Sequence, residues 1–207
     1  MHLRIRQLLD STRAAEEDIL SAALAVLHER DDTLFVALDS LPAPIYVTDA
    51  NGFVTYFNSA CIGFAGRLPV VGKDQWCVTW KLFTDNGDLL PHALCPMADA
   101  IKGNRRIRGV TAVAERPDGT RVNFMAYPTP LYGEDGELVG AVNMLIDITE
   151  QRQASELRAQ ALRCRRWAGA VGDRQTSETL ERLANDYDAK AMELDQSRLP
   201  LPTITPL

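Results

Sequence analysis

The stretch Asn143–Arg152 reads NMLIDITEQR and decides how the second half of the chain is organised. Its first half is apolar and typical of a buried strand, whereas its second half is charged and typical of a helix. Neither glycine nor proline separates the two. Asp147 and Glu150 have capping-box spacing and Thr149 is a second candidate cap, so we predict that the helix starts directly off the strand. A junction this stiff is suited to passing movement from a sheet into a helix.

Upstream of this junction, three turn sequences alternate with strand-like runs. They are DANG at Asp49–Gly52, PDG at Pro117–Gly119 and EDG at Glu134–Gly136. Asn-Gly and Asp-Gly pairs favour tight turns because these residues tolerate positive φ. The β-rich runs beside them predict five strands. Residues 59–109 add helical fragments and one strand-like turn sequence, KLFTDNGDLLP. We therefore predict an α+β fold in which a five-stranded antiparallel sheet carries its helices on one face.

Helical patterns flank this sheet region, which we assign to residues 41–150. We predict that residues 1–40 form an amphipathic helical segment that ends at the two prolines of LPAP. Residues 151–196 carry two apolar seams separated by GAVGD, which predicts a helical hairpin or two coiled-coil pieces. Residues 197–207 contain three prolines and predict a loose tail. The seam residues are Leu157, Ala161, Cys164 and Ala168, then Leu180, Leu183, Tyr187, Ala191 and Leu194.

Composition and charge disfavour several classes of protein. With 46% hydrophobic and 24% charged residues, the chain of 207 residues has the composition of a soluble globular protein. Its formal net charge of -6 argues against general attraction to nucleic acid or anionic lipid. No apolar run approaches the roughly 20 residues that cross a bilayer, and acidic residues interrupt any signal-peptide core. We therefore expect a cytoplasmic protein without membrane contact.

The four cysteines are scattered without CxxC pairing, which fits a reduced compartment. This arrangement predicts neither a disulfide framework nor a zinc site. We expect all four to be small buried side chains. They are Cys61, Cys77, Cys95 and Cys164.

Taken in order, these features resemble the PAS domain, a sensory module common in bacterial signalling proteins. The resemblance covers roughly residues 39–152. Its most specific mark is Asp147-Ile148-Thr149, which matches the Asp-Ile-Thr ending where the last strand of the family passes into a signalling helix. The resemblance implies that these three residues relay the signal. Supporting matches are the Asp49–Gly52 turn, Asn58 with Ala60 at the first inner helix, and the repeated Asp-Gly turns.

The resemblance also implies that a ligand, where one is bound, lies between the sheet and the inner helices. The identity of such a ligand stays unknown at this point. Ordinary core packing explains each candidate lining residue as well as ligand contact does. These candidates are Tyr46, Trp76, Trp80, Met97, Phe124 and Met144.

His92 and Cys95 are the sharpest candidates for cofactor chemistry. They are three residues apart, so a helix would place them on one face, and either could ligate haem iron. Haem-binding PAS domains often supply a histidine near this part of the fold, and Cys95-Pro96 resembles a pair found in haem-responsive sequences. Pro96 also suits the first turn of a helix, and His92 also fits an exposed loop. A zinc site is less consistent with the sequence than haem ligation, because only two potential ligands come together where a zinc ion usually has four.

A flavin cofactor is less consistent with the sequence than haem. The light-sensing branch of the PAS family carries a reactive cysteine in a segment like Asn-Cys-Arg-Phe-Leu. Here Cys77 lies in QWCVTW and Cys61 lies in NSACIGFAG, and neither matches. Noncovalent flavin stays open.

The sequence lacks the motifs of common enzymes: GxSxG, HExxH, a P-loop and GxGxxG are all absent. No histidine follows Thr149, so a histidine kinase output is not expected there. We therefore expect a stand-alone PAS sensory protein and no enzyme. It would bind a small ligand or cofactor and relay its state through Asp147-Ile148-Thr149 to dimerising helices and to a partner such as a kinase or regulator.

Two alternatives use the helices differently. In the first, the chain is a ligand-free PAS dimerisation module, because apolar seams support dimerisation directly. In the second, the C-terminal helices bind DNA through clustered arginines, but the second helix is dominated by acids where a recognition helix needs basic and amide side chains. These arginines are Arg152, Arg158, Arg163, Arg165, Arg166 and Arg174.

Overall fold

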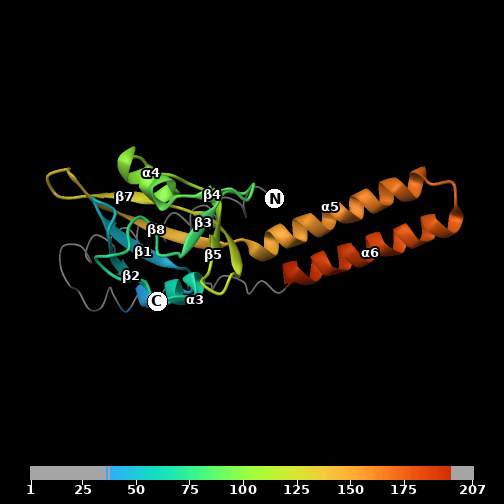
Figure 1. Cartoon of the computed structure of the whole chain (residues 1–207), viewed down its shortest axis with the longest axis horizontal. Helices are drawn as coiled ribbons and strands as arrows, with labels where there is room; N and C mark the ends of the chain where they lie inside the picture. The colour runs from blue at the N-terminus through green and yellow to red at the C-terminus, as the bar shows by residue number, and fades with distance from the viewer. Residues whose placement is uncertain (1–35, 37, 197–207) are drawn as a thin grey trace, which may run out of the picture. The chain divides into compact units, whose positions relative to one another are not determined.

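The computed structural model describes Val36 and residues 38–196. The tail predicted at 197–207, and nearly all of the helical segment predicted at 1–40, lie outside the described residues. The chain divides into two compact units, Met1–Asp147 and Ile148–Leu207. The first unit contains a sheet with short helices, and the second contains two long helices (Figure 1).

The first unit is built on one antiparallel sheet of eight strands. Their order is β2-β1-β8-β6-β5-β3-β4, and β7 also pairs with β8. The longest strand, β8, therefore pairs with three others, β1, β6 and β7. The strands are β1 Ile45–Asp49, β2 Val54–Phe57, β3 Lys81–Phe83, β4 Leu89–Leu90, β5 Val110–Glu115, β6 Arg121–Ala126, β7 Thr129–Tyr132 and β8 Leu138–Asp147.

The α+β class and the antiparallel sheet agree with the prediction, but the strand count of five was wrong. Tyr127 and Pro128 divide one predicted strand into β6 and β7, since proline has no N–H to give to the ladder. The N–H of Tyr127 donates both to the Met144 carbonyl of β8 at 3.1 Å and to the side chain of Asn143 at 3.0 Å. The sequence KLFTDNGDLLP forms a complete hairpin, β3 and β4, which extends the sheet beyond β5. Gly87, with φ of 89°, supplies the tight turn of this hairpin.

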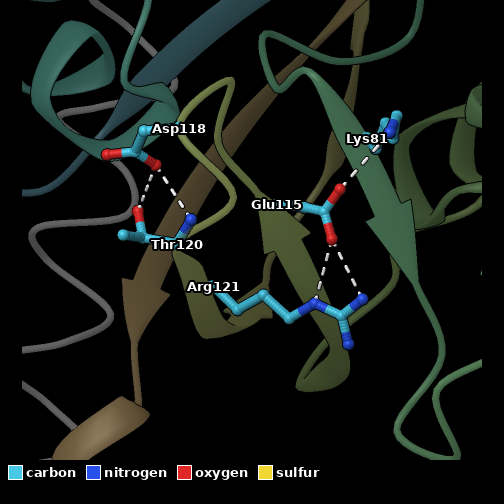
Figure 2. Close-up of polar contacts among 5 residues, drawn as sticks. All are labelled: Lys81, Glu115, Asp118, Thr120 and Arg121. Atoms are coloured by element: carbon cyan, nitrogen blue, oxygen red, sulfur yellow. Dashed lines mark hydrogen bonds and ion pairs between the residues drawn. The ribbon is translucent and has the colours of Figure 1, made fainter.

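An exposed charge network ties the added hairpin to the sheet, as Figure 2 shows. Glu115 accepts hydrogen bonds from Arg121 Nε and Nη2, at 3.1 and 2.9 Å, and from Lys81 Nζ at 3.4 Å. Lys81 and Arg121 lie directly opposite Glu115 on β3 and β6. The bonds from Arg121 and Lys81 lower the pKa of Glu115. In the adjoining turn, two hydrogen bonds from Thr120 lower the pKa of Asp118.

The two faces of the sheet bury different sets of side chains, because successive strand residues point to opposite faces. Between β2 and β5 lie three short helices: α3 Ala60–Ala65, the 3-10 helix η1 His92–Leu94, and α4 Pro96–Lys102. α3 packs against β1, while α4 packs against β7 and β8. One buried cluster joins side chains of α3 and α4 to side chains of the sheet, and we call it the inner core. It includes Tyr46, Phe64, Met97, Phe124 and Leu145. The outer cluster includes Leu38, Ile45, Val47, Leu131 and Val142.

The second unit is an antiparallel hairpin of α5 Thr149–Ala170 and α6 Arg174–Gln196 (Figure 1). Small side chains line its buried seam, so the two helix axes can approach closely. One predicted seam position was wrong: Leu183 is 40% exposed, and Ala184 takes the buried place beside it. The buried residues are Ala154, Ala161, Cys164 and Ala168 on α5, and Ala184 and Ala191 on α6.

Candidate functional site

A continuous series of buried polar groups crosses the inner core, and we call it the polar line. Asn143 on β8 donates from Nδ2 to the Tyr46 hydroxyl at 3.0 Å. The Tyr46 hydroxyl donates in turn to the Trp76 carbonyl at 3.0 Å. At the other end, Asn143 Oδ1 accepts the Tyr127 N–H at the break between β6 and β7. The polar line therefore connects the segment before β3 to the strand that leads into α5.

Trp76 is held in an unusual backbone conformation that aims its carbonyl into the core. Its φ is 69°, a value that few residues other than glycine adopt. Its N–H donates to the Gly52 carbonyl at 2.7 Å, and its ring lies where a side chain at position 52 would be. Lys102 Nζ lies 4.9 Å from the ring centroid. The first turn of the sheet and the end of α4 thus position this residue together.

Cys95 reaches the same carbonyl, since its thiol lies 3.6 Å from the Trp76 oxygen. Burial raises the pKa of Cys95 to about 12, with the neighbouring Cys77 thiol adding to the shift. Burial also raises the pKa of Tyr46 well above its usual value, again with a contribution from Cys77. Both groups are therefore neutral hydrogen-bond donors at physiological pH.

His92 lies at the rim of the inner core, in a second polar cluster. Its Nε2 is 3.5 Å from Thr79 Oγ1, which is itself 3.2 Å from Cys77 Sγ. Arg67 donates to the Thr79 carbonyl at 3.3 Å and pairs with Asp74 at 2.8 Å. Burial and the positive charge of Arg67 lower the pKa of His92, and Asp74 opposes this shift. His92 is therefore neutral near pH 7.

The lowered pKa of His92 predicts that the protein loses stability in mild acid. The unfolded chain, with an ordinary histidine pKa of 6.5, binds this proton more readily than the folded protein does. The stabilisation is therefore complete above the unfolded pKa and disappears as pH falls below it toward the folded pKa. We expect the melting temperature of the wild type to fall more than that of His92→Gln between about pH 7.5 and about pH 5.5. Equal decreases in the two proteins would contradict this assignment.

The structure separates the two residues expected to share a haem site. His92 begins η1, whereas Cys95 immediately precedes α4, so no single helix presents both on one face. Cys95 faces the Trp76 carbonyl, and His92 faces Thr79. To ligate haem iron as a thiolate, Cys95 must also lose its proton, and its pKa of about 12 opposes this loss. These residues fit haem poorly.

The other predicted lining residues fall into three groups. Tyr46, Met97 and Phe124 lie in the inner core, and Trp76 packs against it. Trp80 does not line the core, because it is 52% exposed. Met144 lies on β8 next to Asn143 but points the other way, into the outer cluster. The predictions for Trp80 and Met144 were therefore wrong.

The strand-to-helix junction is as short as predicted, although its cap differs. β8 ends at Asp147 and α5 begins at Thr149, so Ile148 alone lies between them. Ile148 occupies the N-cap position, and the helix has no side-chain cap there. Asp147 is thus one residue too early for the predicted capping box. Glu150 still lies in the first turn, where a negative charge favours the helix dipole.

Sequence reasoning missed Asn143, the residue at the centre of the polar line. One signal was available, because Asn143 is the only polar side chain in the run LVGAVNMLI. A buried amide nearly always has hydrogen-bond partners, so its presence there predicts a specific contact. Its partner Tyr46 lies 97 positions away, and pattern analysis cannot identify it.

Three of the six C-terminal arginines form ion pairs with acids within the hairpin. Arg158 pairs with Asp195, and Arg165 pairs with Asp188 at 2.6 Å. Arg174 pairs with Glu178 at 2.8 Å. These ion pairs neutralise positive charges that the DNA-binding alternative would need for contact with phosphate groups.

Within residues 38–196, no group of three or more His, Cys, Asp or Glu side chains is arranged to hold a metal ion. None of the helices in the described part of the chain has the length and apolar character to span a membrane.

Several known proteins are similar to this chain. The C4-dicarboxylate transport sensor protein DctS of Rhodobacter capsulatus is 26% identical over 151 residues, which are 72% of this chain and 21% of that protein. The chain thus spans about a fifth of that relative's length. Among solved structures, the Rhodobacter sphaeroides LOV protein is 15% identical with a TM-score of 0.45, covering 83% of this chain and 99% of that one. The PAS domain of the fruit-fly ELK potassium channel is also 15% identical, with a TM-score of 0.47, covering 59% and 99%.

A family model described as PAS fold matches residues 38–153, which is more than half of the 207 residues. Its limits include β1, the inner helices, β8 and the junction into α5. The resemblance noted in the sequence is therefore confirmed, and the chain belongs to the PAS fold family.

Proposed function

We propose that this chain is a cytoplasmic PAS sensory protein that couples the state of its inner core to the α5–α6 hairpin, and through it to a partner such as a kinase or regulator. The observation that carries the proposal is the position of Asn143. This residue anchors the polar line in the middle of β8, and the same strand runs into α5 with only Ile148 between them. A change in the hydrogen bonds of Asn143 therefore acts on the strand that the signalling helix continues.

The chemistry of the inner core favours a neutral ligand. Every side chain of the inner core is uncharged, and Tyr46 and Cys95 keep their protons at physiological pH. Burying a charged ligand there without a partner would cost several kcal/mol or more. A small and largely apolar molecule with one or two hydrogen-bonding groups fits better. Such a ligand would compete for the Tyr46 hydroxyl or the Asn143 amide and break the polar line.

The relay from the inner core to α5 can be tested by replacing Asn143, the residue at the centre of the polar line. Leucine has nearly the shape of asparagine, but in Asn143→Leu it cannot bond to Tyr46 or to the Tyr127 N–H. We expect amide hydrogen exchange in the first two turns of α5 to change several-fold, because β8 and α5 are joined by a single residue. Asn86→Leu makes the same chemical change in the exposed turn between β3 and β4 and serves as the control.

Because the chain divides into two compact units, hydrogen exchange in the variant can be compared separately for each unit. If exchange changes only within Met1–Asp147, the core and the hairpin are uncoupled and the relay proposal fails. The ligand is tested separately, by mass spectrometry of small molecules released when the purified protein is denatured. We expect a neutral organic molecule, and a haem absorption band lost in His92→Ala would contradict that expectation.

A further inference from the structure

Two turns of the sheet contain the dipeptide Asn-Gly, and their main chains are folded alike. The pairs are Asn51-Gly52, between β1 and β2, and Asn86-Gly87, between β3 and β4, and the sequence contains no others. The two glycines have φ values of 84° and 89°. The N–H of each donates to the carbonyl three residues earlier, at 3.0 and 2.9 Å. A chemical difference between the pairs must therefore come from their surroundings.

The first pair is enclosed by the segment that precedes β3. Gly52 is buried, and its carbonyl accepts the Trp76 N–H at 2.7 Å. A Cβ at Gly52 would lie 2.2 Å from the Trp76 ring. The Asn51 carbonyl accepts a hydrogen bond from Gln75 Nε2 at 2.9 Å, and the Asn51 N–H donates to Asp49 Oδ1 at 2.9 Å. The peptide bond between Asn51 and Gly52 can therefore turn only by breaking these contacts.

The second pair lies in an open turn at the end of the sheet. Asn86 and Gly87 are both exposed, and a Cβ added at Gly87 would have no neighbouring atom within 4 Å. β4, which follows the turn, has two residues and is the last strand in the sheet order. Few contacts thus oppose a local rearrangement of this peptide bond, and local opening costs least in such exposed turns.

We propose that Asn86 is a site of spontaneous modification, at which the side-chain amide is lost and the main chain is rerouted through the side chain. The Gly87 nitrogen attacks the side-chain carbonyl carbon of Asn86, and the new C–N bond closes a succinimide ring. The amide group leaves with the N–H proton as ammonia. Water then opens the ring at either carbonyl, which gives aspartate or isoaspartate. One ammonia leaves and one water enters, so neither an enzyme nor an oxidant is needed.

Glycine favours this reaction because it has no Cβ beside the attacking nitrogen and allows the widest range of main-chain angles. Both Asn-Gly pairs share this advantage. The hydrogen bond that holds the glycine N–H slows ring closure in both turns to a similar extent, since the two distances are nearly equal. At Asn51, however, the contacts with Gln75 and Trp76 must also break. We therefore expect modification at Asn86 and protection at Asn51.

The isoaspartate product should loosen the β3–β4 hairpin, because it lengthens the main chain of the turn. The Thr84 N–H donates to the Asp88 carbonyl at 2.8 Å, and the Asp88 N–H donates to Thr84 Oγ1 at 3.2 Å. A longer main chain between these residues cannot keep both bonds. Strands as short as β4 depend on their turn. Leu90 of β4 packs against the inner core, so the modification would release one edge of that core.

The test follows both asparagines in the same sample of the full chain. The purified protein is kept at body temperature in mildly alkaline buffer, which favours loss of the Gly87 N–H proton. A methyltransferase specific for isoaspartate labels the product, and mass spectrometry of peptides locates the label. We expect the label to accumulate at least about tenfold faster at Asn86 than at Asn51. Asn86→Gln is the matched control, because glutamine keeps the amide but forms a larger ring far more slowly, so no label should appear there.

Hydrogen exchange of the aged protein tests the effect on the hairpin. Amides of residues 81–90 should exchange several-fold faster in the aged wild type than in the fresh protein, and aged Asn86→Gln should show no change. Absence of label at Asn86, or equal label at Asn51 and Asn86, would overturn the assignment of the site. Label at Asn86 with unchanged exchange in residues 81–90 would overturn its effect on the hairpin.

Discussion

Replacing Asn58 by alanine is expected to destabilise the first unit by about 3–5 kcal/mol, because one side chain satisfies four backbone groups. Asn58 Oδ1 accepts the Ile45 N–H at 2.9 Å. Its Nδ2 faces the carbonyl oxygens of Leu38, Leu41 and Ala43 at 3.1, 3.3 and 2.9 Å. Asn58 is completely buried, so water cannot readily replace these bonds. Urea unfolding followed by tryptophan fluorescence, which includes Trp76 of the first unit, measures the loss.

Two further variants separate hydrogen bonding from lost volume. Asn58→Asp keeps the acceptor for Ile45 but presents a carboxylate to three carbonyl oxygens, so it should be at least as destabilising as Asn58→Ala. Ser59→Ala changes the next residue, whose hydroxyl makes one exposed hydrogen bond at 3.3 Å to Asp39. It should alter stability by less than about 0.5 kcal/mol. A loss below about 1 kcal/mol in Asn58→Ala would show that the amide does not hold β1 in place.

The features predictable from sequence were those set by neighbouring residues. The Asp49–Gly52 turn is an example, because Asp49 Oδ1 accepts the N–H groups of Asn51 and Phe53 and Gly52 has a φ of 84°. The direct passage from β8 to α5 is another, since it depends on an abrupt change of pattern at Asp147. Such local signals were sufficient to recognise the family.

The errors arose where distant residues decide the outcome. β4 has only two residues, too few to show a strand period. Met144 was assigned to the wrong face because the face depends on the pairing register of β8 with β1. Leu183 was assigned to the helical seam by its spacing from Leu180 and Tyr187, whereas close packing of the two helices buries the smaller Ala184. The polar line needs residues from four separate parts of the chain, around Tyr46, Trp76, Tyr127 and Asn143, and no local pattern reports their contact.

Gly140→Ala is expected to have the second large effect, because the new methyl group would collide with the backbone of β1. Gly140 lies opposite Asp49 in the β1–β8 pairing. A Cβ at this position would lie 1.9 Å from the Thr48 carbonyl oxygen and 3.2 Å from Asp49 Cα. A backbone oxygen within a paired strand cannot move aside without breaking the ladder. We therefore expect a loss of about 3 kcal/mol or more in urea unfolding.

A matched control distinguishes this collision from a general effect of replacing glycine. Gly63, in α3, has open space around it, because a Cβ added there would have no neighbouring atom within 4 Å. Gly63→Ala should therefore be neutral or stabilising by up to about 1 kcal/mol. The difference between the two variants then isolates the β1–β8 contact. Because β8 also carries Asn143 and continues into α5, Gly140→Ala should change hydrogen exchange at the start of the helix as well. A stable Gly140→Ala protein with unchanged exchange would mean that β1 and β8 can separate at this point without consequence for the hairpin.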